Sequence, residues 1–195
     1  MAGSGFGIYG GRGNSRLLGG VTSVLSGGRC KQVTLDPKAS TGSAQYADPT
    51  RVRRIVIPAE ESLPQGFGLD DVRGLLDHET GHAIWSDFAG FCPQDALEKQ
   101  VTNIVEDARI ERLIVKRYAG SAHNVATMNR TIIGGIQTEA FERMSAIEQA
   151  LGTLSVILCG GDQDAFLADK KYRVELGALM RRLLPLAEKG VKGSC

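Results

Sequence analysis

Residues 78 to 82 read His-Glu-Thr-Gly-His, with three residues between the two histidines and a glutamate directly after the first. On a helix, positions four residues apart lie on the same face, so His78 and His82 can direct both imidazoles at one ion. Neutral imidazole nitrogen is a ligand that Zn²⁺ takes readily. Glu79 lies about 100° round the helix from His78, where its carboxylate can accept a proton from water. The spacing therefore predicts a zinc site with an adjacent base.

This HExxH spacing is typical of zinc metallopeptidases. The chain has only three histidines, and two of them are in the motif. We therefore predict a zinc-dependent peptidase with one zinc ion per chain, Glu79 as the general base, and a peptide or protein as substrate. The flanking apolar residues repeat near the helical period of 3.6, which favours a helix around the motif; they are Val72, Leu75, Leu76, Ala83 and Ile84.

A catalytic zinc ion normally has three protein ligands, so a further ligand is needed. Some zincins have a histidine six residues after the motif, but here that residue is Phe88. The better candidate is the acidic stretch Asn103–Glu111, on a predicted second helix. Because Glu106 and Asp107 are neighbours, only one can face the ion: we predict Glu106 as the ligand, with Asp107 as the alternate. Asp107 or Glu111 could orient an imidazole through its second N–H.

His123 and Tyr118 are two further candidates with weaker support. His123 lies in Ala119–Asn124, a predicted loop, where it could be an alternative third ligand or a donor that faces the substrate. Tyr118 could be a similar donor. A histidine in such a loop is more often simply solvated, and an acidic helix such as Asn103–Glu111 can also be an exposed charged face held by i,i+3 and i,i+4 pairs.

The pattern of apolar residues predicts an α+β fold, a small β-sheet followed by a helical bundle that carries the HExxH helix. Strands are predicted at Cys30–Leu35 and Arg51–Ile57, with a loop over Asp36–Pro49. Arg53–Ile57 could offer an edge to an extended substrate peptide. The predicted helices are Leu69–Phe88, Gln94–Tyr118, Val125–Arg143, Ala146–Leu158 and Ala165–Ala187.

The N-terminal 28 residues contain ten glycines, a density at which little apolar surface can be buried. We predict that residues 1–28 are largely disordered, although Leu17–Leu25 could dock on the core. Residues 29–190 are predicted to form one zincin-like metallopeptidase domain.

The composition excludes several classes of partner. A net charge of +1 over 195 residues gives no reason to expect nucleic acid, and no apolar run reaches the roughly 18 residues of a membrane span. The beginning of the chain has no apolar core typical of a signal peptide. The four cysteines have no CxxC spacing, so we expect free thiols in a reducing, cytoplasmic setting.

The stretch from Leu75 to Phe88, followed by Val101–Glu111, resembles a group of zincin-like proteins of bacteria and phages. These proteins often pair a metallopeptidase-like domain with a von Willebrand A domain, and the large subunit of aerobic cobaltochelatase is similar over the same two helices. The resemblance implies that His78, His82 and Glu106 hold a metal and that Glu79 is the acid/base. It also implies an alternative function, a non-catalytic scaffold that works with a von Willebrand A or AAA+ ATPase partner. The chain lacks an Asp-x-Ser-x-Ser motif, so it resembles the metallopeptidase-like part alone.

Overall fold

A three-stranded mixed sheet forms the centre of the first part of the chain in the computed structural model of the protein, which describes residues 12–49, 51–63, 66–87, 89 and 93–193. Strand β3 lies between the other two, parallel to β1 and antiparallel to β2. Its β-branched residues suit a pleated, buried surface, and Ile55 and Ile57 are fully buried. The strands are β1 (Val33–Asp36), β2 (Ser43–Asp48) and β3 (Arg51–Pro58).

Two sequence predictions about this sheet are wrong. The predicted loop Asp36–Pro49 contains strand β2, which lies at an edge of the sheet and pairs with β3. The segment Arg53–Ile57 lies in β3, whose two sides are both paired, so it offers no open edge. Among the described residues, β2 is an edge strand, because one of its sides pairs with β3 and the other pairs with no strand.

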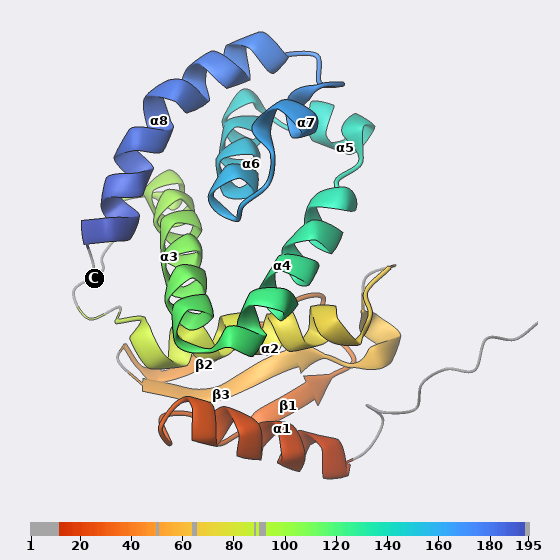
Figure 1. Ribbon diagram of the computed structural model, residues 1–195, viewed down its shortest axis with the longest axis vertical. Helices are drawn as coiled ribbons and strands as arrows, with labels where there is room; N and C mark the ends of the chain where they lie inside the picture. The colour runs from red at the N-terminus through yellow and green to blue at the C-terminus, as the bar shows by residue number, and fades with distance from the viewer. Residues whose placement is uncertain (1–11, 50, 64–65, 88, 90–92, 194–195) are drawn as a thin grey trace, which may run out of the picture. The chain divides into compact units, whose positions relative to one another are not determined.

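A helix, α1 (Arg12–Leu25), lies alongside strand β1 (Figure 1). Its glycines allow close packing, since a Cβ added at Gly19 would come within 3.0 Å of the backbone oxygen of Lys31. Thr22, on the same helix, is fully buried. The predicted disorder of residues 1–28 is therefore wrong for residues 12–25, and residues 1–11 lie outside the described part of the chain.

After a single 3-10 turn, η1 (Glu60–Ser62), the first unit ends with α2 (Leu69–Trp85), which packs on β2 and β3. The start of α2 is fixed by Asp71, whose Oδ2 accepts a 2.6 Å hydrogen bond from the backbone N–H of Gly68. Such a bond satisfies a donor at the helix N-terminus, where acidic side chains are also favoured by the helix dipole.

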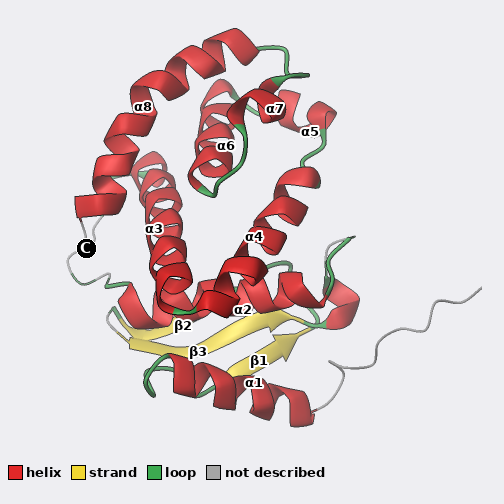
Figure 2. Ribbon diagram, in the orientation of Figure 1, coloured by secondary structure: helices red, strands yellow, loops and turns green. Residues whose placement is uncertain are grey.

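The rest of the chain, from Gly90, is a second compact unit. Figure 2 shows helices joined by loops, and no strand, among its described residues. One apolar cluster joins α3, α6 and α8 through Ala108, Leu154, Leu158 and Met180. The helices are α3 (Ala96–Arg117), α4 (Ala119–Gly134), α5 (Thr138–Glu142), α6 (Ala146–Leu158), α7 (Gln163–Leu167) and α8 (Arg173–Gly193).

The α+β fold class is confirmed, with a small mixed sheet followed by helices. Helix α6 has the predicted limits, because Ser145 and Glu148 form a capping box that marks its start in the sequence. Two of the long predicted helices are divided in two. A break at Gly135 separates α4 from α5, and residues 168–172 separate α7 from α8.

Candidate metal centre

The HExxH motif lies in the C-terminal half of α2, as its spacing predicts. The two imidazole rings of His78 and His82 are neighbours, with centroids 4.9 Å apart and planes at 76°. Both side chains are partly exposed. Helical geometry alone brings them together, since residues four apart lie one above the other on the helix surface.

A second contact orients the His82 ring. Its Nδ1 lies 2.8 Å from the hydroxyl oxygen of Ser86, the residue that follows the last residue of α2. The backbone N–H of Ser86 also donates to the His82 carbonyl oxygen, which fixes Ser86 at the helix end. When Nδ1 carries the proton and donates to Ser86, Nε2 carries the lone pair that a metal requires. The sequence analysis missed Ser86, although a hydroxyl four residues after the second histidine was visible.

Glu79 lies between the two histidines in sequence, and its side chain is buried, with 5% of its surface exposed. It packs against Gly42, the residue immediately before β2. A Cβ added at Gly42 would come within 2.9 Å of Glu79 Oε1 and 3.1 Å of its Cγ. The absence of a side chain at Gly42 therefore makes room for the Glu79 carboxylate beside the edge strand. Sequence reasoning missed this glycine because no local pattern links it to Glu79, which lies 37 residues later in the chain.

In the second unit, α3 carries the acidic stretch from which a third ligand was predicted. Asp95 caps the start of this helix by accepting a 2.8 Å hydrogen bond from the backbone N–H of Glu98. Glu106 forms a two-pronged ion pair with Arg109, in which both N···O distances are 2.7 Å. Both side chains of this pair are largely buried. The Glu106 carboxylate thus has a strong partner one turn away on its own helix.

Asp107 lies on a different face of α3, together with Glu111. Glu111 Oε2 accepts a 2.8 Å hydrogen bond from the Asn129 side chain of α4, which holds that buried carboxylate in place. Burial, together with the nearby charges of Glu111 and Asp107, raises the pKa of the Cys159 thiol to about 12. Asp107 and Glu111 are four residues apart on α3, so they lie on the same side of the helix.

His78, His82 and Asp107 are a group of side chains that could hold a metal ion. Two imidazoles and one carboxylate form a donor set that zinc accepts, although other divalent metals accept it as well. Among the predicted ligands, the group contains both histidines and the alternate carboxylate Asp107. Glu106 does not belong to it, and its carboxylate is the one paired with Arg109.

The two weaker candidates lie near the junction of α3 and α4. His123 is exposed and lies within α4, so the predicted loop at Ala119–Asn124 is wrong. The reason is that α4 begins directly after Tyr118, the residue that ends α3. The Tyr118 hydroxyl accepts a 3.0 Å hydrogen bond from Arg117 Nε, whose guanidinium also lies 5.5 Å from the Tyr118 ring centroid.

No helix in the described part of the chain is long and apolar enough to cross a membrane. Comparisons of the chain with protein-family models, with curated proteins and with solved structures found no match.

Proposed function

We propose that the protein is a zinc-dependent metallopeptidase, with His78, His82 and Asp107 as metal ligands and Glu79 as the general base. The observation that carries this proposal is the arrangement on α2: two neighbouring imidazoles with a buried carboxylate between them in sequence. The His82–Ser86 contact supports it, because a metal-binding histidine is usually held through its other ring nitrogen. A zinc ion held by this group would supply Lewis acidity at neutral pH.

In the proposed mechanism, Glu79 transfers the proton. Its Oε1 lies beside the backbone of Gly42, so the carboxylate is held near the beginning of strand β2. There it accepts a proton from the attacking water and passes it to the nitrogen of the leaving amine. A non-catalytic scaffold site would need only the metal ligands, so a base at Glu79 distinguishes a peptidase from a scaffold.

In the proposed complex, the substrate peptide binds along the edge strand β2. Its inner side pairs with β3 in antiparallel register, with Ala44 opposite Ile55. An extended peptide that added to its outer side would form backbone hydrogen bonds without regard to side-chain identity. The Glu79 carboxylate, against Gly42, would then lie at one end of that bound peptide.

The test is a comparison of wild type with Glu79→Gln, in zinc content after reconstitution and in cleavage of an unstructured peptide mixture followed by mass spectrometry. Glu79→Gln keeps the shape but cannot accept a proton, so zinc should be retained and cleavage should fall by about 100-fold or more. Glu61→Gln, an exposed glutamate of η1 in the same unit, is the matched control and should cleave like wild type. Equal cleavage by Glu79→Gln would refute the assigned mechanism.

The second candidate function is a non-catalytic module that works with a von Willebrand A or AAA+ ATPase partner. The observation that favours it is the close packing of Glu79 on Gly42, since a buried glutamate in such contact can also have a purely structural role. Under this proposal zinc would bind, no peptide would be cleaved by wild type, and Glu79→Gln would lower the melting temperature. Under the first proposal Glu79→Gln changes cleavage and leaves the melting temperature nearly unchanged.

A further inference from the structure

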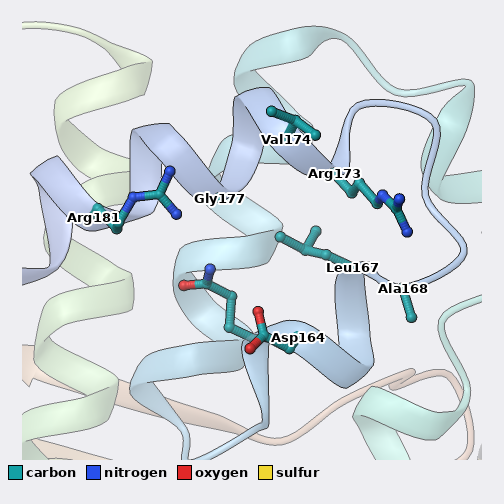
Figure 3. Close-up of a pocket in the computed structure, with 8 residues that line it drawn as sticks. Asp164, Leu167, Ala168, Arg173, Val174, Gly177 and Arg181 are labelled. Atoms are coloured by element: carbon teal, nitrogen blue, oxygen red, sulfur yellow. The ribbon is translucent and has the colours of Figure 1, made fainter.

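A pocket of about 390 Å³ lies between helices α7 and α8 of the second unit (Figure 3). Arg173, Gly177 and Arg181 line it from α8, and they lie four residues apart, on one face of that helix. Asp164 and Leu167 line it from α7. The pocket is built from these two helices and the short segment that joins them, so it is independent of the candidate metal ligands.

Among the described residues, neither Arg173 nor Arg181 has an acidic partner for its guanidinium. Within the described part of the chain, no ion pair or side-chain hydrogen bond engages the guanidinium of Arg173 or of Arg181. Arg109, by contrast, is held by both oxygens of Glu106. An arginine presents a planar set of donors that matches a carboxylate, and two such sets at one pocket favour an anionic group.

Gly177 keeps the space between the two arginines open. A Cβ at this position would lie 3.5 Å from the side-chain nitrogen of Gln163 and 3.8 Å from a guanidinium nitrogen of Arg181. These are ordinary contact distances, so a side chain at residue 177 would fill the gap between the amide and the guanidinium. The glycine leaves both groups accessible to a ligand.

The other residues that line the pocket are apolar or acidic, unlike those of a site that binds only an inorganic anion. Leu167 is almost fully buried and provides an apolar floor, while Val174 is 70% exposed and provides an apolar wall. Asp164 adds a negative charge among the lining residues (Figure 3). A doubly charged phosphate would be repelled by Asp164, whereas a single carboxylate can meet an arginine while an N–H of the same ligand meets Asp164.

We propose that this pocket binds a free carboxylate whose neighbouring group is apolar and carries an N–H. This is the chemistry of the last residue of a peptide that ends in an apolar side chain, and also of a small N-acylated amino acid. In the proposed complex the carboxylate meets Arg181 or Arg173, the apolar group packs on Leu167 and Val174, and the N–H donates to Asp164.

The experiment measures binding to the full chain by calorimetry and by NMR titration. The probe is N-acetyl-L-leucine, and it is compared with N-acetyl-L-leucinamide, which lacks the charge, and with hexanoate, which lacks the N–H. The expected order of affinity is N-acetyl-L-leucine above hexanoate, with the amide at least about tenfold weaker than the acid, since a charge-assisted hydrogen bond is lost. A peptide ending in Leu is then compared with N-acetyl-L-leucine: tighter binding of the peptide identifies a peptide end, and equal binding identifies the small acid.

The variants connect binding to the pocket. Arg181→Ala should weaken N-acetyl-L-leucine binding by about tenfold or more, and Arg173→Ala should weaken it in the same direction. Arg182→Ala is the matched control, because Arg182 is exposed on the same helix and does not line the pocket. Equal weakening by Arg182→Ala, equal affinity for the acid and the amide, or no binding of the acid at all would each overturn the proposal. Unchanged far-UV circular dichroism establishes that each variant is folded.

Discussion

Gly42 lies directly against the carboxylate of Glu79, so that a Cβ at residue 42 would come within 2.9 Å of Glu79 Oε1. This contact joins the residue before the edge strand β2 to the residue that we propose as general base. The atom in the way is the far end of a flexible side chain, so an added methyl group would displace the carboxylate rather than the backbone. The contact therefore makes the position of Glu79 testable without removing Glu79.

We predict that Gly42→Ala retains zinc and lowers peptide cleavage by about tenfold or more, because a displacement of about 1 Å in a reacting group can cost even more. The free energy of unfolding should change by less than about 1 kcal/mol, since only the carboxylate must move. Urea unfolding, zinc analysis and cleavage of the same peptide mixture check this. Cleavage equal to that of wild type would show that the carboxylate does not need its place beside β2.

Asp107 and Glu106 offer a matched pair of neighbours on α3. We predict that Asp107→Asn weakens zinc binding by more than the roughly 10–100-fold typical of residues that only support a ligand. Glu106→Gln should leave zinc binding nearly unchanged. Instead, it should cost about 1–3 kcal/mol of stability, because Arg109 loses the carboxylate at 2.7 Å. Competition with a zinc chelator measures affinity, and the reverse order of the two variants would make Glu106 the ligand.

The sequence was sufficient for those parts of the structure that depend on residues close together in the chain. The i,i+4 spacing of His78 and His82 and the limits of the helix Ala146–Leu158 depend on local sequence, and both have their predicted form. Choosing between Glu106 and Asp107 requires the orientation of a whole helix. One residue corresponds to about 100° of rotation, which the apolar pattern of α3 does not define closely enough.

Long-range packing explains what could not be predicted. Ser43–Asp48 contains no β-branched residue and no buried side chain, so its own propensity does not favour a strand. It is held by long-range contacts, the pairing with β3 and the packing of α2. Helix α1 is similar, because its glycines disfavour an isolated helix but permit the approach to Lys31. The contact of Gly42 with Glu79 is also long-range, and it has no sequence signal.

Cys159 leads to a prediction about pH. Its pKa is raised from 9.0 to about 12 by burial and by the charges of Glu111 and Asp107, so the folded state favours the neutral thiol. The stability from this preference is fully present below pH 9 and is lost as the pH rises from about 9 to about 12. The urea midpoint of wild type should therefore fall over this range more steeply than that of Cys159→Ser. Parallel curves for the two proteins would show that the thiol does not titrate abnormally.

The same shift predicts that Cys159 resists alkylation in the folded protein. The thiolate is the reactive form, and at pH 8.5 almost none is present when the pKa is about 12. Iodoacetamide at this pH should modify Cys159 only after unfolding in urea, as measured by peptide mass spectrometry. Glu111→Gln removes one of the charges that raise the pKa, so it should increase the rate of modification. A rapid reaction in native wild type would contradict the burial of this side chain.

Deletion of residues 1–28 tests whether α1 is part of the folded first unit. Thr22 is fully buried and Gly19 lies against the backbone of Lys31, so loss of α1 would expose the side of β1 that it covers. We predict a fall of at least about 5 °C in melting temperature, which for a domain of this size corresponds to roughly 1–2 kcal/mol. Leu17→Ser is the control, because Leu17 is 68% exposed on the same helix and its replacement should have little effect. An unchanged melting temperature on deletion would mean that α1 contributes nothing to the stability of the sheet.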